Sequence, residues 1–373
     1  AGTAASLDTA DDLYDEMGAF CDAVHKEDFY VYKGAFLGWI KILVISYLIG
    51  VLFLWFDKPL YTLVLAVGSL CILVLQFFLY LTLLDMFYPK RKARNVYGVI
   101  EPSDADKNQV ILSGHHDSAH VFNFFIHQPK LYHLRTTGSI FFVILLILMS
   151  FISLILTSNQ DIILVSKIIL SFGFLLVGQM WFFKSKNAAP GAGDNLLASS
   201  IALTIGKHFK SLKDQGVGLK HTRLIIMSFD AEEEGLRGAR AYVKKHKAEL
   251  HHVKTQMINM DCLYDENELF FLTSDLNDFV KLDQTLVNDL VETSSKLGID
   301  VKTQRLAFLT GGTDAAELAK IGISATTLIG MPWSNKKRGQ VYHTPNDKLE
   351  AVRPQVITDT LNILEEYIKD KDI

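Results

Sequence analysis

Four long apolar runs constrain the fold of this 373-residue chain more than any other feature. They are Phe36–Phe56, Pro59–Leu84, Thr136–Gln160 and Ile162–Phe183. Each run is long enough for the roughly 20 residues that a helix needs to cross about 30 Å of hydrocarbon. Buried helices of a soluble core are the alternative, but core helices seldom extend this far without charged residues. We therefore predict four transmembrane α-helices.

Two lysines interrupt these runs. Lys41 and Lys167 each lie within a turn or two of one end of a run. A lysine at that depth can extend its side chain to the membrane surface, and we favour this interpretation for both residues. A functional role for Lys167 is the alternative.

The runs form two predicted hairpins, with turns at Asp57-Lys58 and Thr157–Asp161. The segments before, between and after the hairpins then lie on one side of the membrane. The predicted organisation is a water-soluble domain in three pieces, split by the hairpins: an N-terminal helical part (1–35), hairpin 1 (36–87), a first part (88–135), hairpin 2 (136–183) and the main part (184–373).

The basic residues near the hairpins predict the orientation. They gather on the side of the soluble domain, at Lys33, Lys90, Arg91, Lys92, Arg94, Lys130, Arg135, Lys184 and Lys186. The turn side carries Lys58 alone. By the positive-inside rule, we predict a multi-pass membrane protein whose soluble domain lies on the cytoplasmic side. Three widely spaced cysteines fit a reducing compartment.

The charge pattern indicates which binding partners to expect. The net charge is -4, and no basic cluster is interleaved with aromatic residues, so we predict no nucleic-acid partner. The lipid bilayer is a predicted partner, and nothing in the sequence indicates an oligomeric state.

Outside the apolar runs, short buried strands alternate with helical stretches. The predicted strands are Gln109–Leu112, Arg223–Phe229, Gln256–Met260, Leu269–Leu272 and Ala325–Ile329. The predicted helices are Asn195–Leu212, Leu236–His246, Asp278–Leu297, Asp314–Ile321 and Pro354–Lys369. This alternation predicts an α/β fold with a mostly parallel central sheet flanked by helices, and a site at the carboxyl ends of the strands.

Polar residues follow the first of these strands, in the segment Ser113–Ser118. In an extended segment, His115 and Asp117 point to the same side because side chains alternate. Asp117 can then hold the ring of His115, as carboxylates do behind metal-bound histidines. An ordinary polar turn is the alternative, and His116 could be the ligand instead.

Two acidic segments have both a structural and a functional interpretation. Asp194 precedes a predicted helix, where it would either cap the helix or bridge two cations. Glu232 and Glu233 follow a strand, within Asp230–Gly235. Adjacent carboxylates are costly unless a cation lies between them, although a solvated helix start would also tolerate them. In the functional interpretation, one glutamate binds metal and its neighbour acts as a base.

Two later residues complete the candidates. Asp261 directly follows the strand Gln256–Met260, where its carboxylate can reach the same site. His343 lies in the loop Tyr342–Asp347 and, by itself, would be interpreted as a surface histidine.

The order of these motifs resembles the di-zinc aminopeptidase family. His-x-Asp is followed by Asp-Asn, by Glu-Glu after a strand, by Asp after a strand and by a late Tyr-His-Thr. Asn95–Gly98 and Gly311–Asp314 also resemble a first strand and a late loop of that family. Its members include glutamate carboxypeptidases, glutaminyl cyclases, and the non-catalytic transferrin receptor and nicastrin. The resemblance covers the soluble segments and implies the zinc-peptidase type of α/β fold.

The resemblance also implies the roles of the site residues. The implied metal ligands are His115, Asp194, Glu233, Asp261 and His343. They would hold two zinc ions that share Asp194, and manganese or cobalt could substitute. Glu232 would be the general base, and Asp117 would hold the ring of His115.

The implied function is that of a membrane-anchored metallo-aminopeptidase, which hydrolyses N-terminal residues of peptides through a metal-bridged hydroxide. A carboxypeptidase, an endopeptidase, a glutaminyl cyclase and a non-catalytic membrane scaffold are the alternatives, and the complete ligand set argues against the scaffold. A carboxypeptidase would need arginines for the substrate carboxylate. Arg305 and Arg338 are candidates, although we expect both at the surface.

The chain departs from the family in one respect. Soluble relatives have a short connection between the first histidine and the bridging aspartate, whereas here the second hairpin separates His115 from Asp194. We therefore expect the active site to face the membrane and to accept hydrophobic or membrane-derived peptides. Simple tethering of an enzyme that acts on ordinary peptides is the alternative.

Overall fold

The computed structural model of the chain describes residues 1–155, 160–307, 309–332 and 334–372, and most of the predicted turn Thr157–Asp161 lies outside them. The chain divides into two compact units. We call 1–33, 89–119 and 188–373 the sheet unit, and 34–88 and 120–187 the helical unit.

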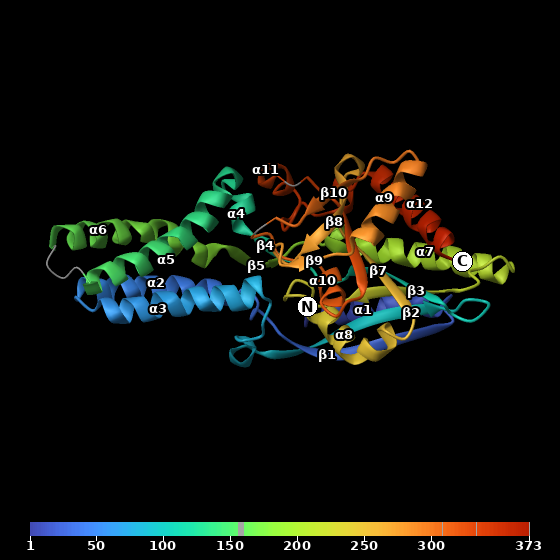
Figure 1. Ribbon diagram of the computed structural model, residues 1–373, viewed down its shortest axis with the longest axis horizontal. Helices are drawn as coiled ribbons and strands as arrows, with labels where there is room; N and C mark the ends of the chain where they lie inside the picture. Colours follow the sequence, from blue (N-terminus) through green and yellow to red (C-terminus); the bar gives the residue numbers. More distant parts are fainter. Residues whose placement is uncertain (156–159, 308, 333, 373) are drawn as a thin grey trace. The chain divides into compact units, whose positions relative to one another are not determined.

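A mixed, nine-stranded sheet forms the centre of the described part of the sheet unit (Figure 1). Its strands follow the order β1-β2-β6-β3-β7-β11-β8-β10, and β9 pairs with β8. Their bounds are β1 (Ala23–Tyr32), β2 (Lys90–Ile100), β3 (Asn108–His115), β6 (Thr222–Phe229), β7 (Lys254–Leu263), β8 (Leu269–Asp275), β9 (Val280–Lys281), β10 (Lys302–Arg305) and β11 (Ser324–Gly330). All five strands predicted from apolar runs are present.

Parallel pairing is concentrated in the four central strands β6, β3, β7 and β11. The flanking pairs β1–β2, β2–β6 and β11–β8 are antiparallel. The prediction of a mostly parallel sheet was therefore too simple. Apolar runs reveal strands that are buried on both faces, as in a parallel sheet, and they do not reveal a partly exposed strand at the sheet edge.

Strand β1 corrects the prediction that residues 1–35 are helical. Helix α1 (Ala4–Gly18) covers only the first half of this segment. The second half is β1, whose residues alternate between exposed and partly buried positions. Its charged side chains pair with those of β2, as where Asp28 binds Lys92 and Arg94. Such a charged edge strand lacks the apolar run on which the strand predictions rested.

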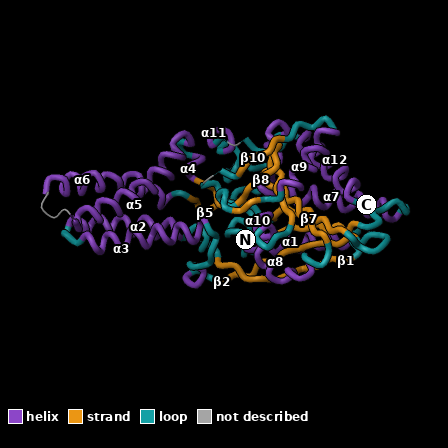
Figure 2. The backbone as a smooth tube through the Cα atoms, in the orientation of Figure 1, coloured by secondary structure: helices purple, strands orange, loops and turns teal. Residues whose placement is uncertain are grey.

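Helices cover both faces of the sheet, and Figure 2 shows them flanking the strands. Four helices pack on one face: α1, α7 (Leu197–Asp214), α9 (Gln284–Lys296) and α12 (Pro354–Lys371). Two pack on the other: α8 (Arg237–Leu250) and α10 (Ala315–Ala319). The short helices of this unit are Ala192–Leu196, Glu266–Glu268, α11 (Asn335–Arg338) and Leu349–Ala351. The continuous apolar core lies between these layers.

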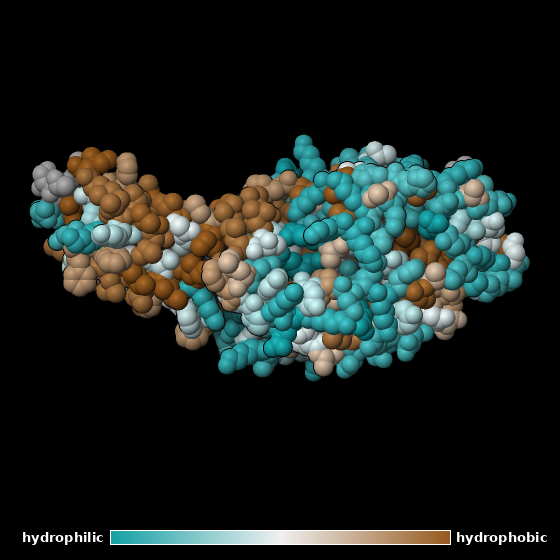
Figure 3. Space-filling view, turned by 90° about the horizontal axis from the view of Figure 1, so that it is seen from below, coloured by the Kyte–Doolittle hydropathy of each residue, from teal (hydrophilic) through white to brown (hydrophobic). Residues whose placement is uncertain are grey.

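In its described residues, the helical unit contains four apolar helices that pack side by side (Figure 1). They are α2 (Trp39–Trp55), α3 (Pro59–Leu73), α5 (Tyr132–Ile155) and α6 (Gln160–Val177). Short elements extend or connect them: Val74–Phe78, Asp85–Phe87, β4 (His120–Phe122), α4 (Asn123–Ile126), Pro129–Leu131, Gly178–Phe182 and β5 (Lys184–Ala188). Much of the outer surface of the four helices is hydrophobic, as Figure 3 shows in brown.

Three of the described helical segments are long and apolar enough to cross a membrane, namely Pro59–Phe78, Pro129–Ile155 and Gln160–Phe182. The fourth predicted span corresponds to α2, which is apolar but has 17 residues. Its length is at the lower limit of the roughly 17–25 residues of transmembrane helices.

Lys167 is buried within the helical unit, with 8% of its surface exposed. Its ammonium group lies 2.6 Å from a carboxylate oxygen of Asp57, in the turn between α2 and α3. The charge that interrupts the apolar run therefore has a partner at the turn end of the first helix pair.

Candidate functional site

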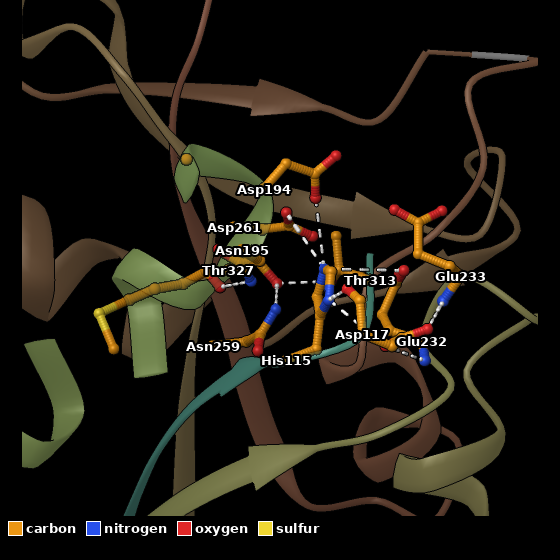
Figure 4. A network of polar contacts seen from close by, with 12 residues as sticks. His115, Asp117, Asp194, Asn195, Glu232, Glu233, Asn259, Asp261, Thr313 and Thr327 are labelled. Carbon is orange, nitrogen blue, oxygen red and sulfur yellow. Dashed lines mark hydrogen bonds and ion pairs between the residues drawn. The ribbon is translucent and has the colours of Figure 1, made fainter. Parts of the chain in front are cut away.

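His115 is the last residue of β3 and lies at the centre of a cluster of carboxylates (Figure 4). Its side chain is buried, and its Nε2 atom is 3.4 Å from Asp194, 3.8 Å from Glu232 and 4.0 Å from Asp261. The adjacent His116 is not part of this cluster, because its Nδ1 atom is hydrogen-bonded to the Ser228 hydroxyl at 2.8 Å. Of the two candidate histidines, the structure thus places His115 at the site.

Asp117 connects His115 to the acidic loop after β6. Its carbonyl oxygen is 3.1 Å from Nδ1 of His115, and its carboxylate lies 3.5 Å from the same atom. The carboxylate also accepts hydrogen bonds from the backbone N–H groups of Glu232 and Glu233, at 3.0 and 3.3 Å. Asp117 thereby contacts the His115 ring on the side away from the other carboxylates and holds two residues of the opposite loop.

Asp194 lies between the two histidines of the site. One carboxylate oxygen is 3.4 Å from Nε2 of His115, and the other is 3.2 Å from Nε2 of His343. The alternative interpretation, a cap of the following helix, does not apply, because Leu196 occupies the N-cap position of α7. Asp194 is 2% exposed, so its carboxylate faces the site rather than solvent.

The glycine-rich turn before Asp194 is fixed by residues that the sequence analysis did not identify. Asp347 accepts hydrogen bonds from the Gly193 backbone N–H at 2.8 Å and from the Tyr264 hydroxyl at 2.9 Å. A Cβ atom at Gly193 would collide with the Tyr264 ring, so this position requires glycine. No spacing pattern links these three residues, which lie far apart in the sequence.

The acidic residues after β6 lie in a loop rather than at a helix start. Helix α8 begins at Arg237, after the acidic segment. Glu233 approaches His343, with 3.3 Å between its carboxylate oxygen and Nε2. Glu232 approaches His115. The two neighbouring glutamates therefore face different histidines of the same site, and Figure 4 shows both beside the cluster.

The structure brings all seven predicted site residues together, namely His115, Asp117, Asp194, Glu232, Glu233, Asp261 and His343. Among the described residues there are three sets of metal-ligand atoms, and within each set the atoms lie within 4.8 Å of one another. The sets are His115–Asp194–Asp261, Asp194–Glu233–His343 and His115–Glu232–Glu233. The first two sets share Asp194. Such clusters of imidazole and carboxylate donors are typical of metal sites.

The electrostatics of the cluster also favour a cation. Burial raises the pKa of Glu232 well above its usual range, and the carboxylates of Glu233, Asp261 and Asp314 raise it further against the opposing effect of His115. Burial likewise raises the pKa of Asp261 to about 7, and His115 opposes this effect. Carboxylates this close together cannot all be ionised at neutral pH unless positive charge lies among them.

The donor atoms themselves fit a metal ion. Among the described residues, Nε2 of the buried His115 has no hydrogen-bond partner, although three carboxylates surround it. A buried imidazole nitrogen normally has such a partner. Imidazole nitrogens and carboxylate oxygens are the ligands that catalytic zinc takes in proteins. The residues therefore fit zinc.

One further buried carboxylate lies near the cluster. Asp314 directly precedes α10 and is fully buried. Burial raises its pKa well above the usual range, with His115 opposing this effect and Asp117 and Asp261 adding to it. The segment Gly311–Asp314 resembles a late loop of the family, but no role for Asp314 could be predicted from it.

The two candidate arginines lie in different environments. The Arg305 side chain is 73% exposed, as predicted. Arg338 is only 5% exposed, so the expectation of a surface position was wrong for this residue. Its guanidinium group lies 5.4 Å from the Tyr342 ring centre, and the Tyr342 ring stacks on His343 at 3.8 Å.

Comparison with known proteins adds a family and a fold. The profile of peptidase family M28 matches residues 180–368, more than half of the chain. A search of curated proteins found no match. Among solved structures, a glutaminyl cyclase from Porphyromonas gingivalis aligns with 99% of this chain and 91% of its own, at 13% identity and a TM-score of 0.58. A zinc aminopeptidase from Bacillus subtilis aligns with 99% and 90%, at 14% identity and a TM-score of 0.55.

An aminopeptidase from Aneurinibacillus sp. strain AM-1 is also similar, at 18% identity and a TM-score of 0.47. The alignment covers 76% of this chain and 48% of that protein, so the chain spans about half of its length. At these identities the solved structures show the fold alone. The family profile covers the segments that carry Asp194, Glu232, Glu233, Asp261 and His343, in the order that the sequence analysis used to predict the family. The chain belongs to peptidase family M28.

Proposed function

We propose that this chain is a zinc-dependent metallopeptidase that removes N-terminal residues from peptides. One observation carries the proposal: Asp194 lies between His115 and His343, so that a single carboxylate is shared by two sets of metal-ligand atoms. Membership of a peptidase family supports hydrolysis as the reaction.

We assign the ligands from these sets. One zinc ion is held by His115, Asp194 and Asp261, and the other by Glu233, His343 and the shared Asp194. Manganese or cobalt could occupy the same positions. When bound, a pair of such ions acidifies a water molecule and polarises the scissile carbonyl group.

Glu232 is the general base in this proposal. Its carboxylate lies beside the cluster, 3.8 Å from Nε2 of His115, and belongs to neither of the two ligand sets that share Asp194. It accepts a proton from the attacking water and delivers it to the departing amine. Asp117 positions this base, because its carboxylate accepts the Glu232 backbone N–H.

A carboxypeptidase is the second candidate, and Arg338 favours it. This guanidinium group is buried beside the Tyr342 ring, which stacks on the candidate ligand His343. Arginine is the usual anchor for a carboxylate, since its donors match the two oxygens. A substrate with a free C-terminus would then be bound from this side of the site.

A peptide panel separates these functions. We expect the purified full-length protein to release N-terminal residues from peptides with a free amine, and to lose this activity in a chelator and regain it with added zinc. Amine-blocked peptides should not react. Cleavage of blocked peptides at the C-terminal bond would favour the carboxypeptidase, and cleavage at internal bonds would favour an endopeptidase. Cyclisation of N-terminal glutamine without hydrolysis would favour a glutaminyl cyclase.

We further propose that the helical unit anchors the protein in the membrane through four spans, with the sheet unit on the cytoplasmic side. The exposed apolar surface of its helices supports the anchor. The basic residues at the ends of the hairpins support the orientation. We expect the protein to remain in the membrane pellet after carbonate extraction, and the sheet unit to be digested by protease in inside-out vesicles. Protection in inside-out vesicles would contradict the orientation, and release by carbonate would contradict the anchor.

The substrates of such an anchored enzyme are proposed to be hydrophobic peptides or tails of cleaved membrane proteins. The chain leaves the sheet unit after Ala119, shortly after Asp117, and returns at Ala188, shortly before Asp194. Both connections therefore begin next to site residues. To test this proposal, one peptide sequence is presented with lipid vesicles in two forms, with and without an acyl anchor. Equal kcat/KM for the two forms would contradict the proposal.

A further inference from the structure

A row of buried polar side chains crosses three parallel strands of the central sheet. Ser113 in β3 pairs in register with Asn259 in β7, and Asn259 pairs with Thr327 in β11. These residues are 0, 1 and 0% exposed. Most of the surrounding strand residues are apolar. Buried polar groups at such positions need hydrogen-bond partners, and here each supplies a partner for the next.

The hydrogen bonds of this row run in one direction. The Ser113 hydroxyl donates to Oδ1 of Asn259 at 2.6 Å, and Nδ2 of Asn259 donates to the Thr327 hydroxyl at 3.5 Å. The Thr327 and Thr313 hydroxyls are 2.6 Å apart, and Thr313 donates to Asp275 at 2.6 Å. A carboxylate only accepts, so Thr313 must donate to it and must accept from Thr327. The acceptor at one end thereby sets the orientation of every group up to Ser113.

We call Ser113, Asn259, Thr327, Thr313 and Asp275 the polar row. Figure 4 shows Asn259, Thr327 and Thr313 close to the cluster around His115. Asp275, at the end of the polar row, is held in place by further hydrogen bonds. This fully buried carboxylate also accepts the backbone N–H groups of Leu276 and Thr313, at 2.6 and 2.9 Å.

The position of the polar row relative to the ligands is set by strand geometry. His115 follows Ser113 by two positions, and Asp261 follows Asn259 by two positions. Side chains alternate along a strand, so each ligand lies on the same face as the polar residue before it. Ser113 and Asn259 are therefore the neighbours directly below His115 and Asp261, and the hydrogen bond between them joins the two ligand-bearing strands.

Only one of the two ligand sets contains residues that follow the polar row along β3 and β7. His115 and Asp261 belong to the set that also contains Asp194. The other set consists of Asp194, Glu233 and His343, which lie outside β3, β7 and β11. A change in the polar row should thus affect the two metal positions unequally.

Apolar side chains at the same positions would pack into the sheet without any need for hydrogen bonds, and such replacements are often neutral or stabilising. A polar row therefore contributes little net stability to a sheet centre. A chain of directional hydrogen bonds does fix the relative position of adjacent strands, which apolar contacts do less strictly.

We propose that the polar row is a positioning device that sets the separation of His115 and Asp261, and thereby the affinity of one of the two metal positions. The proposal rests on the metal centre proposed above. The residues of the polar row belong to none of the sets of metal-ligand atoms, and in this proposal they act through His115 and Asp261. Groups that orient metal ligands in this way typically change metal affinity by about 10–100-fold when they are removed.

Neighbouring threonines in β11 provide a matched test. Thr327→Val breaks the polar row. Thr326→Val is the control, because Thr326 is equally buried and its hydroxyl donates to the Leu272 carbonyl at 2.8 Å, outside the row. Zinc binding to the full-length, metal-free protein is measured by calorimetric titration in competition with a chelator of known affinity. We expect Thr327→Val to weaken one of the two zinc-binding events by about 10–100-fold and to leave the other unchanged.

Ser113→Ala is a second variant, which removes a single hydrogen bond of the polar row. It removes the hydroxyl below His115 and should weaken the same zinc-binding event as Thr327→Val. The melting temperature of the metal-free Thr327→Val protein should fall at least as far as that of Thr326→Val, because the Thr327 hydroxyl makes two buried hydrogen bonds and the Thr326 hydroxyl makes one. Cobalt(II) absorption spectra, which report ligand geometry, should change for the row variants and not for Thr326→Val.

The outcomes separate this inference from the proposed function. If the wild-type protein binds two zinc ions and Thr327→Val, Ser113→Ala and Thr326→Val all give the same isotherm, the polar row has no positioning role and the metal centre stands. If both zinc-binding events weaken equally in Thr327→Val, the selective role is also contradicted. If the wild-type protein binds no zinc, the proposed metal centre itself fails, and the inference fails with it.

Discussion

Replacing Glu232 by glutamine is expected to lower kcat/KM for peptide hydrolysis by about 10²–10⁴-fold, the range typical of a general base. Glutamine has nearly the same size as glutamate but cannot accept the proton of the attacking water. Glu232 belongs to neither ligand set that shares Asp194, so the zinc content of the variant should equal that of the wild type. Steady-state kinetics on a free-amine peptide, together with elemental analysis of the same sample, checks both parts.

Glu233→Gln is the matched control, since it makes the same chemical change at the adjacent residue. Glu233 approaches His343 at 3.3 Å and belongs to a ligand set. This variant should therefore lose affinity for one zinc ion, and excess zinc should restore part of its activity. Excess zinc should not rescue Glu232→Gln. If Glu232→Gln instead loses zinc, or retains wild-type kcat/KM, its assignment as the base is wrong.

Asp194→Asn is expected to have the largest effect on metal binding, because Asp194 is the residue that the two proposed ligand sets share. Asparagine keeps the shape of aspartate but removes the negative charge that lies between His115 and His343. We expect this variant to lose both zinc ions under conditions in which Asp261→Asn loses one. The zinc-to-protein ratio after dialysis measures the difference directly.

Thermal unfolding provides an independent measurement of the same loss. A ligand that binds only the folded state stabilises it by about 2.7 kcal/mol when its concentration is 100 times its Kd. Added zinc should therefore raise the melting temperature of the wild-type protein and leave that of Asp194→Asn unchanged. If Asp194→Asn and Asp261→Asn retain the same number of zinc ions, Asp194 is not a shared ligand.

The ends of the central strands could be predicted from the sequence because local patterns determine them. An apolar run followed by a polar residue indicates a buried strand whose carboxyl end meets a site. This reasoning placed His115, Glu232 and Asp261 just after apolar strands. In the structure His115 is the last residue of β3, Glu232 follows β6, and Asp261 lies within β7 near its carboxyl end. Asp194 and His343 follow no apolar strand, and only the order of the motifs connected them to the same site.

The remaining features depend on contacts between distant segments. Tyr264 and Asp347 hold the turn at Gly193, and the polar row joins Ser113 to Asp275 through residues of several elements. A single tyrosine, serine or asparagine in a sequence does not indicate which residue it will be hydrogen-bonded to in the fold. The burial of Arg338 could not be predicted, because charged side chains are usually exposed and only tertiary packing shows the exceptions. The edge strand β1 was missed because its charged and partly exposed residues form no apolar run.

The placement of the helical unit within the chain has a consequence for how the protein is made. Strand β3 precedes β4 and the helices α5 and α6, whereas both of its partners, β6 and β7, follow them. A chain emerging from the ribosome therefore cannot pair its central strands until the second apolar hairpin has been synthesised. The ends of this insertion meet in the finished protein, where the Ala189 N–H donates to the Ala119 carbonyl at 2.8 Å. His343 is the last of the proposed ligands to be synthesised, so the proposed zinc coordination can be completed only after both apolar hairpins have left the ribosome.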